Sequence, residues 1–158
     1  MYTKIMVAVD GSASSKRALE EGLKIARLCG ARLFAVHVVD RALLPAYAGR
    51  ADPNALIEGI RRDGVAVLRD VERTIAHAAV NGDTELLETD SVGEDVAECL
   101  QRYVVEHAID LAVAGTHGRR GVRRAILGSC AERFVRESSC PVLLVRGDDA
   151  PRAAAEAV

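Results

Sequence analysis

The sequence predicts an α/β fold, a single-domain open sheet of five parallel strands with helices on both faces. Short apolar runs without polar alternation recur along the chain, as is typical of strands that are covered on both faces. Segments with apolar residues three and four positions apart separate these runs and are typical of amphipathic helices. Because parallel strands need long crossover connections, this alternation indicates a parallel sheet wound with helices.

The first half of the chain contains two expected buried strands, at residues 5–9 and 33–39. The helix between them is expected to be capped by Ser12 or Ser14, because hydroxyl side chains favour the position before a helix. Gly30 is expected to end this helix, since glycine favours the position after one.

A second, long helix is predicted to start at Asp52 and Pro53, where an aspartate cap precedes a proline at the first helical position. Asn81 and Gly82 are expected to end it. The polar, irregular segment at 40–53 that precedes this helix is at the upper end of ordinary loop lengths, so it is a candidate lid.

The second half of the chain is predicted to supply the other three strands. The polar run at 84–89 has the acidic residues of an edge strand, and the runs at 111–115 and 141–145 are apolar. A capping-box pattern from Ser91 to Glu94 predicts the start of the third helix. The fourth helix is expected between the last two strands.

Composition bounds the class of protein. The formal net charge is −2 and the pI is about 6.1, so nothing attracts the whole chain to nucleic acid or to an anionic membrane. No apolar stretch approaches the ~18 residues of a membrane span. The four cysteines lack C-x-x-C spacing and are expected to be reduced thiols, which predicts a cytoplasmic protein. One domain is expected at 1–147, with a charged, alanine-rich, flexible tail at 148–158.

The most informative segment is the glycine loop that follows the fourth strand. Gly115 and Gly118 leave this strand, and Gly128 and Ser129 come after nine more residues at the start of a helix. Glycines let the backbone approach an anion, and the amide groups at a helix N-terminus point toward it. Four arginines add positive charge to the loop: Arg119, Arg120, Arg123 and Arg124. The segment therefore predicts a phosphate site of a nucleotide-binding protein.

Asp10 directly follows the first strand, and Gly115 ends the fourth. Ligands of open parallel sheets bind at the carboxyl ends of the strands where the strand order reverses, so we expect these two strand ends to be neighbours. Other interpretations stay open: tight turns and close helix packing would also explain the glycines, and a turn or cap would explain Asp10. His117 is expected to form loop hydrogen bonds without a catalytic role, and Cys130 to be an inert thiol.

Taken in order, these segments resemble the universal stress protein family from Lys4 to Arg146. The resemblance is carried by residues 7–12, 37–39 and 140–145 and by the glycine spacing G-x-x-G-x9-G-[ST], which marks the ATP-binding branch of the family. It implies a Rossmann-like sheet, related to the adenine nucleotide α-hydrolase-like folds, with strand order 3-2-1-4-5. It also implies ATP as ligand and a homodimer. Mg²⁺ is expected on the phosphates of the ATP, because this is its usual place on nucleotides.

The resemblance also assigns roles to residues. Asp10 would lie near the adenosine, and the main chain of Val38 would read the adenine edge, which predicts a preference for ATP over GTP. The loop glycines would line the ribose and phosphates, and the helix start would donate amides to the phosphates. Ala8 replaces the proline of some ATP binders. The expected nucleotide-binding residues are Ala8, Asp10, Val38, Gly115, His117, Gly118, Arg119, Gly128, Ser129 and Cys130.

The favoured function is an ATP-binding regulatory protein of the stress response with no catalytic or metal-ligating residue and at most slow ATP hydrolysis. Its homodimer is expected to form through the apolar edge strand at 142–145, and a further protein partner is allowed. One alternative is an ATP pyrophosphatase-type enzyme, although the glycines of such loops are missing before Asp10. Another is an interaction module without nucleotide. A flavin site and a switch-type NTPase are disfavoured, because the chain has no tryptophan and no Walker sequence.

Overall fold

The computed structural model describes residues 1–42, 44, 49, 52–90, 93–117 and 127–147. The predicted tail at 148–158 and half of the candidate lid at 40–53 lie outside these residues. Strands and helices alternate along the described chain. Their order is β1 (Lys4–Ala8), α1 (Ala13–Cys29), β2 (Arg32–Val39), α2 (Pro53–Ala78), β3 (Gly82–Glu88), α3 (Val96–Glu106), β4 (Leu111–Gly115), α4 (Ser129–Glu137) and β5 (Val142–Val145).

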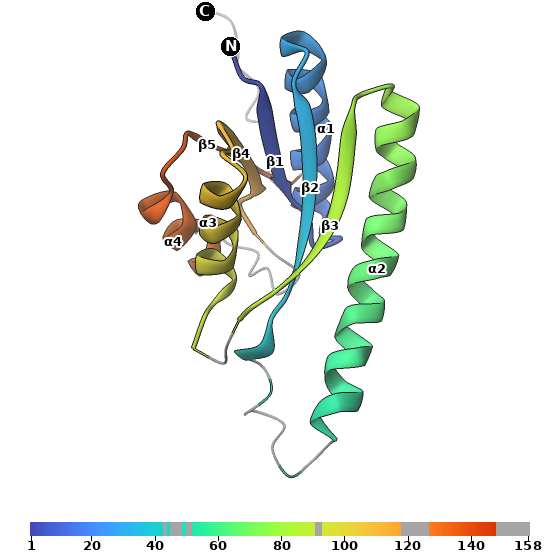
Figure 1. Cartoon of the computed structure of the whole chain (residues 1–158), viewed down its shortest axis with the longest axis vertical. Helices are drawn as coiled ribbons and strands as arrows, with labels where there is room; N and C mark the ends of the chain where they lie inside the picture. Colours follow the sequence, from blue (N-terminus) through green and yellow to red (C-terminus); the bar gives the residue numbers. More distant parts are fainter. Residues whose placement is uncertain (43, 45–48, 50–51, 91–92, 118–126, 148–158) are drawn as a thin grey trace, which may run out of the picture.

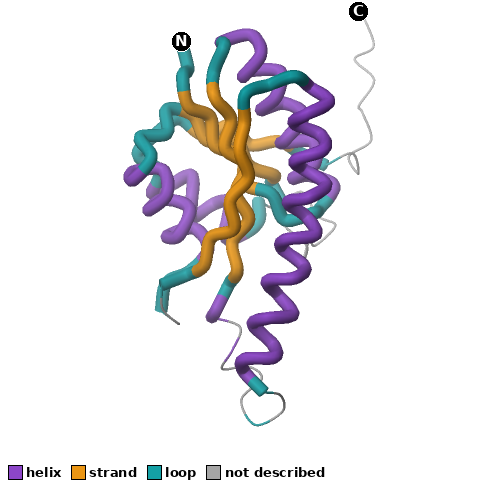
Figure 2. Tube along the Cα trace, turned by 45° about the vertical axis from the view of Figure 1, so that its right-hand side comes forward, coloured by secondary structure: helices purple, strands orange, loops and turns teal. Residues whose placement is uncertain are grey.

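The five strands form one sheet in the order β3-β2-β1-β4-β5, and every neighbouring pair is parallel. Helices α1 and α2 cover one face and α3 and α4 the other, so the sheet is the middle layer of three (Figures 1 and 2). The predicted fold class and strand order are therefore confirmed. Because all strands run the same way, the ends of β1, β2 and β4 meet at one edge of the sheet.

Each face of the sheet has its own apolar core. Alternate side chains of β1 point to opposite faces, so Val7 packs with α1 and α2 while Met6 packs with α3 and α4. Tyr103 of α3 and Phe134 of α4 are almost fully buried in the second core. Strand β1 thus lies at the centre of both cores, as its uninterrupted apolar run predicts.

Helix α1 begins and ends as the sequence predicts. The Ser12 hydroxyl oxygen accepts a hydrogen bond from the Ser15 amide at 3.2 Å, and Gly30 ends the helix with φ of 66°. The helix packs very closely on β1, since a Cβ atom added at Gly22 would lie 2.6 Å from a methyl group of Val7. The start of α1 is therefore fixed relative to the end of β1.

Helix α2 ends earlier than predicted. Its last residue is Ala78, and Ala79 follows in the left-handed region with φ of 52°. Gly82 does not end the helix but begins β3, where a Cβ atom would lie 3.0 Å from the carbonyl oxygen of Leu33. Close approach of β2 is thus the physical reason for this glycine. β3 lies at the edge of the sheet, as predicted.

The predicted capping box of α3 is wrong. The helix begins at Val96, and Asp95 is its cap. The Asp95 side chain accepts from the Glu98 amide at 2.9 Å, and the Glu98 side chain accepts from the Asp95 amide at 2.9 Å. Glu94 instead pairs with Arg102 at 3.0 Å, and Ser91 lies outside the described residues.

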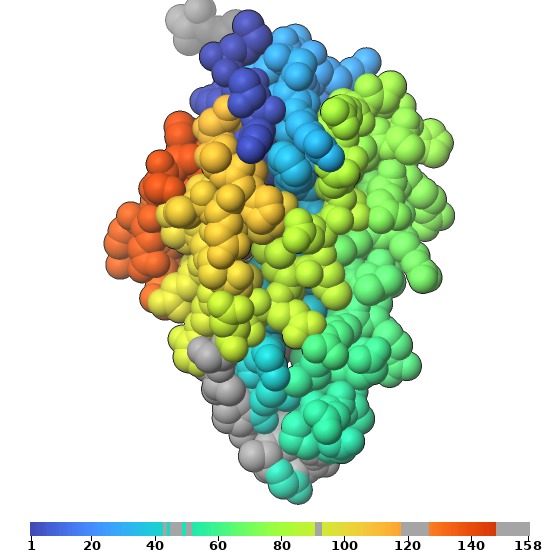
Figure 3. Space-filling model, in the orientation of Figure 1, coloured from blue at the N-terminus to red at the C-terminus, as the bar shows by residue number. Residues whose placement is uncertain are grey.

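Helix α2 is much longer than the strands it covers and forms a ridge along one side of the molecule (Figure 3). Its N-terminal part extends past the sheet, beyond the carboxyl ends of the strands (Figure 1). Within the described residues, none of the helices is long and apolar enough to cross a membrane.

Candidate functional site

The carboxyl end of β1 turns into α1 through Asp10. Its carboxylate oxygen accepts a hydrogen bond from the Ser12 amide at 2.9 Å, and its own amide donates to the Ser15 hydroxyl oxygen at 3.3 Å. This is an aspartate-stabilised turn. The turn interpretation of Asp10 is therefore correct, and it leaves the carboxylate at the strand end, where a ligand of this sheet would bind.

The end of β2 lies beside the end of β1. Ala8 is paired with Val36, and Val38 lies two residues further along β2. Ala8 and Val38 both pack on the face of the sheet that α3 and α4 cover. Asp40 follows β2 and accepts from the Ala42 amide at 2.9 Å, which repeats the turn made by Asp10. Asp40 is not among the residues predicted from the sequence. An aspartate directly after a buried strand is the pattern that could have indicated it.

The base of the glycine loop is closed by backbone hydrogen bonds at Thr116. The Thr116 carbonyl oxygen accepts from the Gly128 amide at 2.9 Å, and the Thr116 amide donates to the carbonyl oxygen of Val145 in β5 at 2.9 Å. The Thr116 hydroxyl and Nδ1 of His117 are hydrogen bonded at 2.9 Å. The predicted site residues Gly118 and Arg119, with Arg120, Arg123 and Arg124, lie outside the described residues.

Gly115 is explained by packing. A Cβ atom there would lie 2.5 Å from Oγ of Ser14 and 2.9 Å from its backbone carbonyl carbon. Real Cβ atoms do not approach this closely, so only glycine lets β4 end against the start of α1. Close helix packing, which was the alternative to a ligand role, accounts for this glycine whether or not a ligand binds.

Gly128 is the N-cap residue of helix α4, and no side chain forms a capping hydrogen bond there. Gly128 has φ of −61° and ψ of 143°, which other residues also adopt, so its backbone conformation does not require glycine. Ser129 and Cys130 are exposed in the first turn, where the amides carry the partial positive charge of the helix. The helix is held to α3 by Arg133, which pairs with Asp95 and lies 2.7 Å from Glu98.

Cys130 lies among carboxylates. Although part of the residue is exposed, desolvation by the surrounding protein raises the pKa of its thiol to about 11. The negative charges of Asp95, Asp40 and Asp10 raise this pKa further. The thiol is therefore protonated at neutral pH, which agrees with the expectation of an inert cysteine. The hydrogen bond from the Gly128 amide to the Thr116 carbonyl oxygen, at 2.9 Å, places the start of α4 beside the end of β4.

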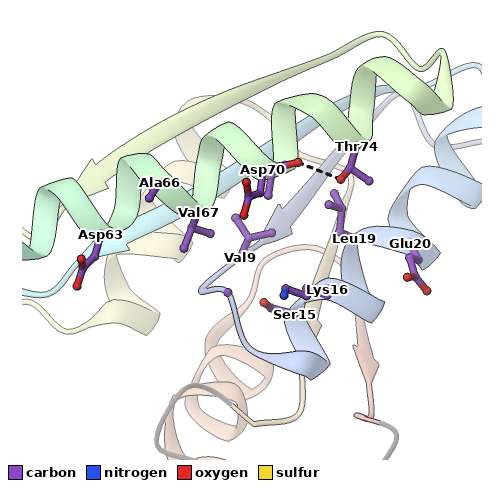
Figure 4. A pocket seen from close by; sticks show the side chains of 12 residues that line it. Val9, Ser15, Lys16, Leu19, Glu20, Asp63, Ala66, Val67, Asp70 and Thr74 are labelled. Atoms are coloured by element: carbon purple, nitrogen blue, oxygen red, sulfur yellow. Dashed lines mark hydrogen bonds between the residues drawn. The ribbon is translucent and has the colours of Figure 1, made fainter.

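A cavity of about 520 Å³ lies between α1 and α2, on the face of the sheet opposite to α3 and α4. Side chains of the two helices face each other across it, with Val9 between them (Figure 4). Within α2, the Thr74 hydroxyl donates to the Asp70 carbonyl oxygen at 3.0 Å. Among the described residues, none of the predicted nucleotide-binding residues lines this cavity. Val9 and Gly11, on either side of Asp10, do line it, so the cavity borders the β1 end of the site.

The strand order, the helices on both faces and the loop at the strand ends define a Rossmann-like α/β protein. The universal stress protein family model matches residues 1–146, and the chain belongs to this family. A universal stress protein of Methanocaldococcus jannaschii is 31% identical over 146 residues, which cover 92% of this chain and 83% of that one.

Solved structures agree. A universal stress family protein from Burkholderia pseudomallei is 38% identical, with a TM-score of 0.73 and coverage of 91% of this chain and 96% of that one. A family protein from Arabidopsis thaliana, solved with AMP bound, has the same fold, with a TM-score of 0.66, 22% identity and coverage of 96% and 97%.

Proposed function

We propose that this protein binds ATP and acts as a regulatory nucleotide-binding protein of the cytoplasm. The observation that carries the proposal is the convergence of β1, β2, β4 and α4, since β1 pairs with both β2 and β4 and the Gly128 amide before α4 donates to the Thr116 carbonyl oxygen directly after β4 at 2.9 Å. A nucleotide spanning these elements would have its base at the strand ends and its phosphates at the helix start.

The adenine end of the proposed site is formed by Ala8, Asp10 and Val38. Ala8 and Val38 supply apolar surface on one face of the sheet, and the main chain at Val38 would read the base edge. The AMP bound to the Arabidopsis relative supports an adenine nucleotide as the ligand class.

The phosphate end is formed by the start of α4. The amides of Ser129 and Cys130 are not covered by a capping side chain, so they are available to phosphate oxygens. The nearby carboxylates of Asp10, Asp40 and Asp95 repel phosphate, and a cation would offset this repulsion.

Mg²⁺ fits this arrangement. It is usually bound by one or two carboxylates together with nucleotide phosphates, and Asp10 and Asp40 supply hard oxygen ligands of this kind. Among the described residues, no group of three or more acidic, histidine or cysteine side chains could hold a metal by itself. We therefore propose that Mg²⁺ binds with the nucleotide and shields its charge.

The proposed role is regulatory and not catalytic. The His117 ring is engaged with the Thr116 hydroxyl, and the Cys130 thiol is protonated at neutral pH. Neither side chain is thereby prepared to act as a base or a nucleophile. A homodimer through the outer edge of β5 is part of the proposal, because that strand is apolar and ends the sheet.

Isothermal titration calorimetry with ATP and GTP in the presence of Mg²⁺ tests the nucleotide proposal. We expect ATP to bind at least tenfold more tightly than GTP, because a strand-end backbone presents one donor and acceptor pattern. Equal affinities for ATP and GTP would exclude an adenine-specific pocket. If neither nucleotide binds and none is released when the protein is denatured, the protein is an interaction module without nucleotide. If ATP is converted to AMP and pyrophosphate, it is an ATP pyrophosphatase-type enzyme.

A further inference from the structure

The first turn of α1 is bonded to the start of the glycine loop, 103 residues away. The Ser14 hydroxyl donates a short hydrogen bond to the carbonyl oxygen of His117. The Ser12 hydroxyl donates a longer one, of 3.4 Å, to the same oxygen, and the two serine hydroxyls are 3.3 Å apart. The direction in which the chain leaves β4 is therefore fixed by α1.

Ser14 is enclosed where these elements meet. Only 4% of its surface is exposed. A Cβ atom at Gly115 would lie 2.5 Å from its hydroxyl oxygen, and one at Gly147 would lie 3.6 Å from its amide nitrogen. Gly115, the last residue of β4, thus leaves the space that Ser14 occupies, whereas a Cβ atom at Gly147 would be in ordinary van der Waals contact. A side chain held this tightly has little freedom, so the hydrogen bond to His117 is geometrically well defined.

The residue next to His117 continues the connection to α4. The Thr116 carbonyl oxygen accepts from the Gly128 amide, and Gly128 is the residue before the first turn of α4. The backbone from Thr116 to His117 consequently joins the start of α1 to the start of α4. Ser14 is bonded at one end of this connection, and the amides of Ser129 and Cys130 follow its other end.

We propose that Ser14 is a positioning residue for nucleotide phosphates. By holding the His117 carbonyl, it orients the base of the glycine loop and hence the amides at the start of α4, without touching the nucleotide itself. This inference rests on the proposed function. It predicts that loss of the Ser14 hydroxyl weakens the binding of phosphates selectively and leaves the binding of adenosine nearly unchanged.

Ser15 provides a matched control. It is the next residue, is also 4% exposed, and carries the same hydroxyl. Its hydroxyl donates to the Ser12 carbonyl oxygen and accepts from the Asp10 amide, so both hydrogen bonds lie within the turn from β1 to α1. Ser15→Ala can therefore disturb the adenosine end through Asp10, but it has no bond to the glycine loop.

The experiment compares the dissociation constants of ATP and adenosine for the full chain and both variants. We expect Ser14→Ala to weaken ATP about tenfold, the scale of one lost hydrogen bond, and adenosine less than twofold. Ser15→Ala should change both ligands by the same factor. An equal loss of ATP and adenosine in Ser14→Ala, or no loss of ATP, would overturn the proposal.

Alanine is smaller than serine and favours helix, so we expect Ser14→Ala to fold. Ser14→Cys keeps a side-chain donor, although a weaker one on a larger atom, and it should fall between wild type and Ser14→Ala in the ratio of the two dissociation constants. Folding of each variant is checked by thermal unfolding. This graded series distinguishes the hydrogen bond from packing of the side chain.

Amide hydrogen exchange separates this inference from the proposed function. Ser14→Ala should accelerate exchange of the Gly128 amide at least tenfold, and Ser15→Ala should leave it unchanged. If the wild type binds no nucleotide, the proposed function fails, but this exchange result still reports whether Ser14 positions the loop. Unchanged exchange at Gly128 in Ser14→Ala would overturn the positioning role even if ATP binds.

Discussion

Glycines in one motif can have different physical causes. Gly115 is required because Ser14 packs against it, whereas Gly128 has an ordinary negative φ and begins α4 beside Thr116. Gly128 does not need a left-handed conformation, so close approach is the remaining reason for this glycine. The spacing of the motif predicts that the glycines are needed, whereas the contacts around each glycine show which close approach of the backbone it allows.

Gly128→Val is expected to weaken ATP binding by about 2 kcal/mol or more, roughly 30-fold. A Cβ atom there would lie 3.2 Å from the Thr116 carbonyl oxygen, so the larger side chain must push α4 away from the loop base. Calorimetry measures the loss. Gly59→Val is the control, since nothing lies within 4 Å of a Cβ atom at Gly59. Normal ATP binding by a folded Gly128→Val protein would move the phosphate site elsewhere.

Cys130 is expected to react slowly despite its exposed surface. A thiol pKa of about 11, compared with 9.0 for an ordinary cysteine, leaves far less thiolate at pH 8. The greater nucleophilicity of a more basic thiolate offsets part of this, so alkylation should be roughly tenfold slower than in the unfolded chain.

The pH dependence of this reaction has a definite sign. Because the pKa in the folded protein is raised, the thiolate is scarce below pH 9 and the alkylation rate should climb steeply from pH 8 toward pH 11. Peptide mass spectrometry after iodoacetamide labelling reports Cys130 separately from the other cysteines. Equal rates in the folded and urea-unfolded protein at pH 8 would contradict the raised pKa.

At the scale of elements, glycines in the helices set their distance from the sheet. A Cβ atom at Gly64 in α2 would lie 2.6 Å from the ring of His37 and 2.8 Å from Leu86, whereas Gly59 in the same helix has open space. Gly64→Ala should therefore destabilise the protein by about 1–3 kcal/mol.

The same substitution at Gly59 should stabilise it by up to ~1 kcal/mol, because alanine favours helix. Denaturant unfolding of the two variants gives the comparison within one helix. If Gly64→Ala were as stable as Gly59→Ala, α2 could not pack on β2 and β3 at the observed distance.

Local patterns predicted most elements and missed one helix start for an identifiable reason. The segment before α3 contains two possible capping boxes, one from Ser91 to Glu94 and one from Asp95 to Glu98. Arg133 of α4 pairs with Asp95 and Glu98, which favours the second. A contact between residues far apart in sequence decides between them, and a local pattern does not contain it.

At the scale of the whole molecule, topology could be predicted because all strands but the polar edge strand β3 are apolar and every connection between successive strands contains a helix. The meeting of the Asp10 and Gly115 strand ends follows from this topology, and β1 and β4 are indeed neighbours. Asp40 and Ser14 could not be assigned in the same way. Their roles depend on groups of distant elements, the Cys130 side chain for the first and the backbone carbonyl of His117 for the second.

The outer edge of β5 determines the last prediction, the homodimer. The Pro141 and Val145 carbonyl oxygens accept from β4, so odd-numbered residues of β5 bond to β4. By strand alternation, the backbone groups of Val142 and Leu144 face away from the sheet. Among the described residues, no strand pairs with this edge. The edge and its half-buried apolar side chains would be covered by the same strand of a second copy, running antiparallel about a two-fold axis.

Leu144→Pro tests this pairing, because proline removes an outward amide and leaves the bonds to β4 intact. We expect light scattering to give a dimer of the 16.9 kDa wild-type chain and a folded monomer for Leu144→Pro. Leu144→Ala, which keeps the amide, should stay dimeric and controls for the lost side chain. A chain ending at Gly147 should also be dimeric, since the tail is the competing cover of β5. A monomeric wild type, or a dimeric Leu144→Pro protein, would show that β5 does not form the interface.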